Sequence, residues 1–332
     1  MADRPLTLSE HLAMQQRLLA DEARGVATVV GRIGRVAAVI AKELAHAALR
    51  DRLGYVGDTN VTGDQVKKLD VWGHDTMEAA LRATGAVASL ISEESEDPIE
   101  MPVEGIHPVV VCCDPVDGSS NLDVNGTVGT IFGLRPARGM SPAGRAALGP
   151  GTDQMAAGYV MYGPATALVY TAGMGSHGFT LDPDKDEFVL THPDIKIPSK
   201  GKTYGINEGN VSTWHPGQRA FVEYLRTPDK ASGRPYSLRY SGAMVADVHR
   251  ILLDGGIFMY PSDLSDPAKP KPKLRLLYEV APMALVIEQA GGCASTGTER
   301  VLALAATDYH QRAAIVIGSP QDVATAEEFY RR

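Results

Sequence analysis

The segment Asp114-Pro115-Val116-Asp117-Gly118-Ser119-Ser120-Asn121 directly follows the apolar run Val109-Val110-Val111-Cys112-Cys113. An apolar run of this length predicts a buried strand. Asp114 would then emerge at the carboxyl end of a strand, where an open, parallel α/β sheet usually forms its ligand crevice. This segment therefore predicts an α/β fold and places an acidic side chain at its expected binding edge.

The residues after Asp114 complete a set of metal ligands. Pro115 fixes its own φ and bends the chain, so Asp117 can turn back toward Asp114 with the Val116 carbonyl between them. Two carboxylates and one backbone oxygen suit a hard cation such as Mg²⁺. The small residues Gly118-Ser119-Ser120 follow where a loop is expected to enter a helix, and their backbone amides could hold a phosphate.

Other acidic side chains follow apolar stretches elsewhere in the chain. Glu93 and Glu94 come just after the apolar stretch 86–90, and Glu279 stands before the helical pattern 282–290. An acidic run is often only a solvated face, and an acid at a helix start often only complements the helix dipole. Since the carboxyl ends of strands share one crevice, we expect Glu93 and Glu94 to join Asp114 and Asp117.

This combination of groups suits phosphate ester hydrolysis. The uncatalysed reaction is very slow, and bound metal ions can neutralise the phosphoryl oxygens, acidify a water and stabilise the leaving oxygen without a serine or cysteine nucleophile. The polar stretch 60–70 adds Thr62-Gly63-Asp64, which reads as a turn on a mobile loop, and Asp70. Asp70 is either the N-cap of the helical pattern that follows it or a catalytic group delivered by the loop.

Several segments together resemble the class I fructose-1,6-bisphosphatases, within the wider group of lithium-sensitive, magnesium-dependent phosphatases. Glu93-Glu94 and the 114–120 segment suggest the wider group. The narrower resemblance lies in the segments Asn60–Asp70, Asn207–Gly209, Arg239–Arg250, Gly256–Pro261 and Lys273–Glu279. It covers nearly the whole chain and implies a layered α-β-α-β-α sandwich, of mixed α/β class, that assembles as a homotetramer.

The resemblance also implies a role for individual residues. The implied ligands of two or three Mg²⁺ ions, which Mn²⁺ or Zn²⁺ could replace, are Glu93, Asp114, the Val116 carbonyl, Asp117 and Glu279. The implied water-activating groups are Asp64, Asp70 and Glu94, with Glu93 also catalytic. The implied substrate contacts are Asp117, Gly118, Ser119 and Ser120 at the 1-phosphate, and Asn207, Tyr240, Tyr260, Lys273 and Arg275 at the sugar and 6-phosphate. Arg239 matches a residue that reaches into the adjacent subunit's site.

Two departures from the family pattern concern regulation and sugar recognition. Animal members bind the inhibitor AMP through a Gly-Thr-Gly-Glu turn and a Lys-Tyr pair, and here these become Gly25-Val26-Ala27-Thr28 and Pro108-Val109. Proline and valine side chains cannot bind phosphate, so we expect AMP inhibition to be weak or absent. Asn210 stands where many relatives have a tyrosine at the 6-phosphate. The alternating lysines and prolines of 267–273 read as an exposed connector, except for Lys273.

Composition limits the possible classes of protein. The chain has 332 residues, 44% of them hydrophobic, and a net charge of −8, with no basic stripe for nucleic acid. No apolar run approaches the roughly 18 residues of a membrane span, and the N-terminus has no signal-peptide pattern. Three cysteines without disulfide or zinc spacing fit a reducing cytoplasm.

The periodicity of apolar residues outlines the organisation of the chain. Residues 8–53 predict two amphipathic helices, with Thr7 and Glu10 as a capping box, and strands and helices are expected to alternate after them. The stretch 139–151, rich in glycine and proline, predicts a long surface loop. We place a boundary near residue 200, which gives an N-terminal domain (1–200) with the metal site and a degenerate AMP-type region, and a C-terminal sugar-phosphate domain (201–332).

The expected function is hydrolysis of fructose 1,6-bisphosphate to fructose 6-phosphate and phosphate. A close alternative is a dual enzyme that also takes sedoheptulose 1,7-bisphosphate in carbon fixation, which Asn210 and the altered AMP residues make plausible. An inositol or nucleotide phosphatase is a more distant alternative, and 239–250 and 273–279 speak against it. A non-catalytic sugar-phosphate sensor is disfavoured by the presence of Asp64, Asp70, Glu93 and Glu94, because pure binding needs no proton acceptor.

Overall fold

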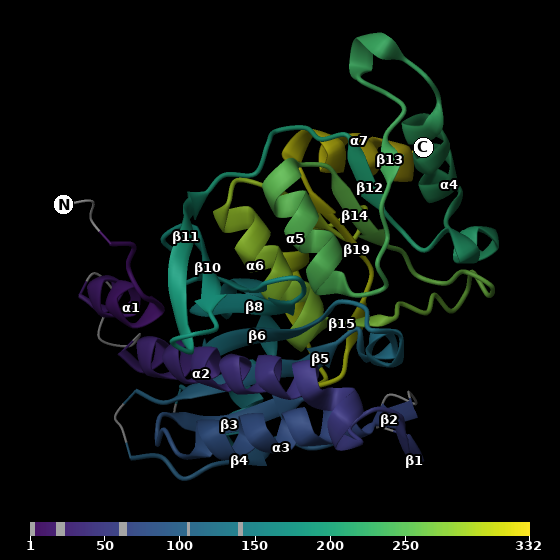
Figure 1. Ribbon diagram of the computed structural model, residues 1–332. Helices are drawn as coiled ribbons and strands as arrows, with labels where there is room; N and C mark the ends of the chain where they lie inside the picture. Colours follow the sequence, from purple (N-terminus) through teal and green to yellow (C-terminus); the bar gives the residue numbers. More distant parts are fainter. Residues whose placement is uncertain (1–3, 18–23, 60–64, 105–106, 139–141) are drawn as a thin grey trace.

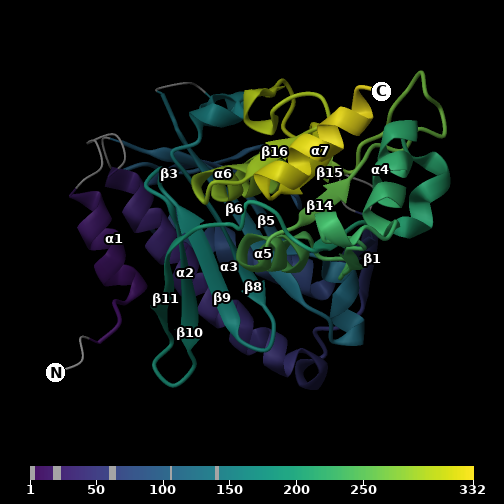
Figure 2. The ribbon, with the colours of Figure 1, turned by 90° about the horizontal axis from the view of Figure 1, so that it is seen from above.

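Five layers of secondary structure form the molecule. The computed structural model describes residues 4–17, 24–59, 65–104, 107–138 and 142–332. From one side to the other, the layers are helices, a large sheet, a pair of helices, a smaller sheet and outer helices (Figures 1 and 2). Both faces of each sheet carry apolar side chains, and these must be covered by another layer. Helical layers therefore alternate with the sheets. The layered α-β-α-β-α arrangement is therefore confirmed.

The first layer is formed by the N-terminal helices α1 (Leu8–Gln16), α2 (Arg24–His46) and α3 (Lys68–Arg82). The expected capping box at α1 is present, because the Thr7 hydroxyl accepts from the Glu10 backbone and the Glu10 carboxylate accepts from the Thr7 backbone. The two predicted helices are thus α1 and α2. α2 ends at His46, and a short 3-10 turn follows over Ala47–Arg50.

The second layer is an eight-stranded sheet in the order β11-β10-β9-β8-β6-β5-β3-β4. Its strands are β3 (Val87–Ser92), β4 (Ile99–Glu100), β5 (Val109–Asp117), β6 (Val128–Pro136), β8 (Ala156–Tyr162), β9 (Thr166–Thr171), β10 (Ser176–Asp182) and β11 (Glu187–Ile195). β3 and β5 run parallel, whereas β5, β6, β8, β9, β10 and β11 pair antiparallel in sequence. The expected parallel sheet and the alternation of strands with helices were wrong here, because short connections allow a meander without crossover helices.

The strand β5 is buried on both faces, and its residues alternate between two cores. Val109, Val111 and Cys113 contact the apolar sides of α2 and α3. Val110 and Cys112 face the third layer, which consists of α5 (Met244–Asp254) and α6 (Ala281–Gln289). This two-residue alternation explains why the run 109–113 is apolar throughout.

The fourth layer is a five-stranded sheet, and the fifth consists of α4 (Pro216–Arg226) and α7 (Pro320–Tyr330). The smaller sheet has the order β13-β12-β14-β19-β16, with β12 (Thr203–Gly205), β13 (Ser237–Leu238), β14 (Ile257–Tyr260), β16 (Cys293–Ser295) and β19 (Ile315–Gly318). Three pairs of short strands lie outside both sheets: β1 (Tyr55–Thr59) with β2 (Gln65–Lys67), β7 (Gly149–Pro150) with β17 (Ala305–Ala306), and β15 (Leu274–Arg275) with β18 (Arg312–Ala313).

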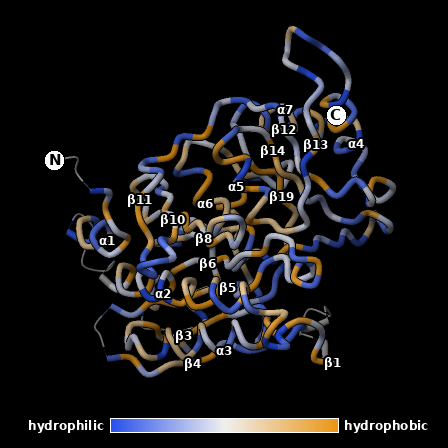
Figure 3. Tube along the Cα trace, in the orientation of Figure 1, coloured by the Kyte–Doolittle hydropathy of each residue, from blue (hydrophilic) through white to orange (hydrophobic). Residues whose placement is uncertain are grey.

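Hydropathy follows these layers. Figure 3 shows hydrophobic residues concentrated in the interior strands and helices, whereas the loop between α4 and β13 is largely hydrophilic. The expected surface loop at 139–151 was wrong in part, because the described residues 143–147 form a 3-10 turn in which Gly144, Ala146 and Ala147 are buried. No helix in the described part of the chain combines the length and the apolar character of a membrane span.

Candidate active site

A bulge in β5 brings Asp114 and Asp117 to the same face of the sheet. Asp114 pairs with Ile131 of β6 and Asp117 pairs with Gly129, so three steps along β5 oppose two steps along β6. Without the extra residue, side chains three apart in a strand would point to opposite faces. The proline at 115 therefore acts as expected in turning Asp117 back toward Asp114, but both acids lie within the strand rather than beyond its end.

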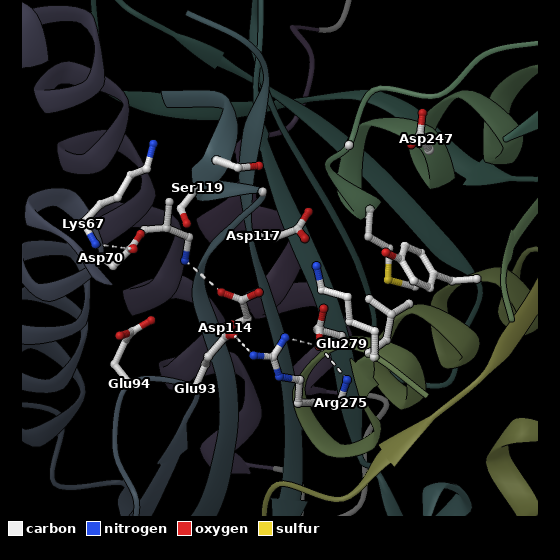
Figure 4. A pocket seen from close by; sticks show the side chains of 18 of the residues that line it. Lys67, Asp70, Glu93, Glu94, Asp114, Asp117, Ser119, Asp247, Arg275 and Glu279 are labelled. Atoms are coloured by element: carbon white, nitrogen blue, oxygen red, sulfur yellow. Dashed lines mark hydrogen bonds and ion pairs between the residues drawn. The ribbon is translucent and has the colours of Figure 1, made fainter. Parts of the chain in front are cut away.

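Glu279 completes a cluster of three buried carboxylates. It comes from a five-residue π-helical turn (Leu276–Val280) that leads into α6, and its Oε2 accepts a hydrogen bond of 2.6 Å from the Arg275 backbone. One carboxylate oxygen from each of Asp114, Asp117 and Glu279 lies within 4.8 Å of the others. Figure 4 shows the three side chains converging from β5 and the start of α6.

The electrostatics of this cluster favour a bound cation. Burial, together with the charge of Glu93, raises the pKa of Asp114 well above its ordinary value. Burial also raises the pKa of Asp117 to about 7 and that of Glu279 to about 8. Carboxylates so close together cannot all ionise without compensating positive charge. A divalent cation would supply that charge, and the all-oxygen donor set suits Mg²⁺, so these residues fit the metal that the sequence implies.

Glu93 lies beside this cluster but pairs with an arginine. It follows β3, which runs parallel to β5, and its backbone amide bonds to the Cys113 carbonyl at 3.3 Å. Its Oε1 lies 2.5 Å from Nη2 of Arg275, whose Nη1 is 3.9 Å from Glu279. The carboxyl ends of β3 and β5 thus share one crevice, as predicted, and Arg275 lies among the acids (Figure 4).

The turn Gly118-Ser119-Ser120 follows the acids directly. Gly118 has φ 75°, in the left-handed region, and a Cβ added there would lie 2.5 Å from Cβ of Ala243. Glycine is therefore required both by conformation and by space. Ser119 begins a 3-10 helix (Ser119–Val124), so the loop enters a short helix as expected.

These groups line one cavity of about 380 Å³. Its walls include Asp70, Glu93, Glu94, Asp114, Val116, Asp117, Gly118, Ser119, Ser120, Tyr240, Tyr260, Lys273, Arg275 and Glu279. A second cavity of about 210 Å³ shares Tyr260 and Lys273 with the first and is also lined by Asn207, Asn210 and Trp214. The segments 93–94, 114–120, 240, 260 and 273–279, which are distant in sequence, therefore meet at one place.

Asp64, Arg239 and Asp70 differ in how far the structure tests their expected placement. Asp64 lies outside the described residues. Arg239 is exposed, does not line either cavity, and donates to the Leu238 carbonyl at 2.7 Å. The N-cap interpretation of Asp70 was wrong, because Asp70 is the third residue of α3 and its Oδ2 accepts from the Lys67 backbone at 2.9 Å. Burial raises the pKa of Asp70 to about 6.

The sequence did not reveal two charged residues of the cavity wall, Lys67 and Asp247. Lys67 is 3% exposed, and its Nζ lies 2.8 Å from Oδ2 of Asp123 and 5.0 Å from the centroid of the Tyr55 ring. Asp247, in the first turn of α5, is 5% exposed and accepts from the Ser241 backbone. A lysine among polar residues and an acid at a helix start are ordinary in sequence, so only their burial reveals them.

Comparisons with known proteins agree with this arrangement. Residues 6–193 match the family model described as fructose-1-6-bisphosphatase, N-terminal domain, and residues 197–331 match the C-terminal domain model of the same enzyme. A protein named fructose-1,6-bisphosphatase class 1 from Maridesulfovibrio salexigens is 42% identical over 98% of each chain. One of the same name from Trichodesmium erythraeum is 44% identical over 98% of this chain and 90% of its own.

Solved structures give the same family. The holo form of Leishmania major fructose-1,6-bisphosphatase matches 99% of each chain with a TM-score of 0.89 and 39% identity. Its T-state structure matches with a TM-score of 0.85 and 37% identity over 99% of each chain. By sequence over its full length and by fold, the chain belongs to the class 1 fructose-1,6-bisphosphatase family.

Proposed function

We propose that this protein hydrolyses fructose 1,6-bisphosphate to fructose 6-phosphate and inorganic phosphate. The observation that carries the proposal is that a single cavity joins a buried acid cluster, a glycine-serine turn and a wall with Tyr240, Tyr260 and Lys273. A sugar bisphosphate has an anionic group at each end, and the two walls of the cavity match those ends. The relatives named above bear the name of the fructose-1,6 enzyme, so the dual enzyme acting on sedoheptulose 1,7-bisphosphate is not favoured.

The acid cluster would hold Mg²⁺. The ligands are Glu93, Asp114, the Val116 carbonyl, Asp117 and Glu279, and Arg275 would exchange its contact with Glu93 for one with the substrate. When bound, the ions neutralise phosphoryl charge and make a nearby water more acidic. Two or three Mg²⁺ ions per site, or Mn²⁺ or Zn²⁺ in their place, are consistent with five oxygen-bearing residues around one crevice.

The remaining residues would orient the substrate and move a proton. The amides and hydroxyls of Gly118, Ser119 and Ser120 would bind the 1-phosphate, while Asn207, Tyr240, Tyr260 and Lys273 would bind the 6-phosphate and sugar. Water attacks phosphorus and gives up a proton, the bond from phosphorus to the sugar oxygen breaks, and that oxygen takes up a proton from solvent water. Asp64, Asp70 and Glu94 would accept the proton of the attacking water, and a pKa of about 6 suits Asp70 to this task.

The proposal extends to assembly and location. We propose a homotetramer in which Arg239 crosses to an adjacent subunit's site, and its exposure outside this chain's own cavity supports that role. We also propose a cytoplasmic location, supported by three cysteines that form no disulfide.

The direct test is phosphate release from fructose 1,6-bisphosphate in the presence of Mg²⁺. The wild-type protein should release phosphate, and Asp117→Asn should abolish the release while preserving the fold. An exposed acid outside both cavities provides the matched control Asp266→Asn, which should behave as wild type. Unchanged activity in Asp117→Asn, with the same thermal midpoint, would refute the assigned site.

A further inference from the structure

The side-chain amide of Asn121 joins two segments that are far apart in sequence. Its Nδ2 donates to the Thr127 carbonyl at 3.0 Å and to the Ser241 carbonyl at 3.1 Å. Both hydrogens of the amide are therefore used. Thr127 belongs to the same local loop as Asn121, whereas Ser241 lies 120 residues further along the chain. Asn121 itself is not among the residues that line the main cavity.

Ser241 begins a tight turn that is held from both sides. Asn121 donates to the Ser241 carbonyl on one side. On the other side, the Ser241 backbone amide donates to the two carboxylate oxygens of Asp247 at 3.0 and 3.1 Å. The turn itself is closed by the Ser241 hydroxyl, which accepts from the Ala243 amide at 3.2 Å, and Gly242 has φ 83°. The residues on each side of this turn, Tyr240 and Met244, both line the cavity. The position of the turn thus sets the position of the cavity wall.

Two further contacts join the same segments nearer the acid cluster. Oδ2 of Asp117 accepts from the Val245 amide at 2.9 Å, and Gly118 lies against Ala243 with no room for a Cβ. These contacts fix the segments at 117–118 and 243–245. Asn121 fixes the other end of the turn, next to Tyr240, so the three contacts together prevent the wall from pivoting about Gly118.

We propose that Asn121 is a positioning residue that sets the separation between the proposed 1-phosphate turn and the wall that bears Tyr240. The inference rests on the proposed function, because a substrate with two phosphates must reach both walls at once. Loss of the Asn121 amide lets the Tyr240 wall shift relative to Gly118–Ser120. Misplacement by about 1 Å can reduce catalytic efficiency by two orders of magnitude. Binding should therefore weaken for ligands that reach both walls and not for ligands that reach only one.

The test compares ligands that reach one wall with the ligand that reaches both. In Asn121→Ala, the KM for fructose 1,6-bisphosphate should rise about tenfold, while the inhibition constants of inorganic phosphate and fructose 6-phosphate change by less than about threefold. Asn121→Asp keeps the shape but turns an oxygen toward two carbonyls, so it should show the same pattern. A residue that only stabilises the fold would lower the thermal midpoint and leave these ratios unchanged.

Asn125, directly after the same 3-10 helix, provides a matched control. It is exposed and has φ 55°, a conformation that aspartate also tolerates. Asn125→Asp should therefore leave the KM unchanged, and it controls for the negative charge that Asn121→Asp adds. An equal rise in KM in Asn125→Asp and Asn121→Asp, together with a wild-type KM in Asn121→Ala, would overturn the proposal.

Other outcomes separate this inference from the proposed function. Absence of phosphate release by the wild type would refute the proposed function, and the role of Asn121 would then be decided by calorimetric affinity for the bisphosphate. Equal losses of affinity for the bisphosphate and for both monophosphates would overturn the positioning role. Failure of both Asn121 variants to fold would also overturn it, because the amide would then support the whole fold.

Discussion

The two walls of the cavity differ in how deeply their side chains are buried and in how firmly the fold holds them. In the acid wall, Asp114, Asp117 and Glu279 are 3–6% exposed and each accepts a backbone hydrogen bond. In the opposite wall, Tyr240 is 37% exposed and Lys273 is also exposed. The first wall is held in place by the fold, and Arg275 supplies only part of the positive charge that its carboxylates need. The second wall is more open to solvent, so its arrangement depends more on what binds to it.

The largest expected effect comes from removing charge from the acid wall. Asp114→Asn should lower kcat by about 10²–10³-fold, the loss typical of removing one electrostatic stabiliser, because the proposed cation site would lose a central ligand. Calorimetry should show weaker Mg²⁺ binding in the same variant. Unchanged kcat and unchanged Mg²⁺ affinity would show that the acid wall is not the metal site.

A smaller effect is expected at the opposite wall. Lys273→Ala should raise the KM about tenfold with a modest change in kcat, since a charge-assisted hydrogen bond to phosphate contributes about 1.5–3 kcal/mol. Lys269→Ala is the matched control, because Lys269 is exposed and lines neither cavity. If steady-state kinetics gave the same KM for both variants, Lys273 would have no special role in the second wall.

The acid wall should also make stability depend on pH when metal is absent. The pKa values of Asp117 (about 7) and Glu279 (about 8) lie above those of the unfolded chain, so the folded protein retains protons that the unfolded chain has released. The free energy of unfolding should therefore fall as pH rises from about 4 to 8 and then level off. For a chain of 332 residues, each kcal/mol lost should lower the thermal midpoint by about 1.5 °C.

Mg²⁺ should remove most of this pH dependence, because it stabilises the ionised carboxylates that protons otherwise neutralise. Thermal melts in chelator and in Mg²⁺, each at pH 5 and pH 8, test this expectation. Asp117→Asn should show a shallower slope in chelator. A metal-free protein that became more stable between pH 5 and 8 would contradict the raised pKa values.

The smallest effect is expected from AMP, which should leave phosphate release essentially unchanged. The structure brings the start of α2 against the segment before β5, since a Cβ at Gly25 would lie 2.8 Å from the His107 carbonyl and 3.4 Å from Val109. Val109 is fully buried and Pro108 has no donor, so this pair cannot bind phosphate through side chains. Inhibition assays with AMP at saturating substrate and Mg²⁺ test this expectation.

Local sequence predicted the acid wall better than the rest of the molecule. Asp114 and Asp117 could be predicted because the strand, the proline and the glycine-serine turn are contiguous. The pairing of Glu93 with Arg275 and the burial of Lys67 beside Asp123 could not, since each depends on partners 56 or more residues away. The fold could be named from the resemblance, but the antiparallel meander from β5 to β11 was missed because a buried run looks alike in parallel and antiparallel sheets.

Trp214 gives the molecule a built-in optical reporter. The chain has two tryptophans, Trp72 on α3 and Trp214 at the end of the 3-10 turn Glu208–Thr213, and Trp214 is 3% exposed in the wall of the second cavity. Indole emission responds to the polarity of its surroundings. Ligand arriving at the wall with Asn207 and Lys273 would therefore change the fluorescence of an unlabelled protein, and Trp72→Phe would isolate that signal for stopped-flow measurements.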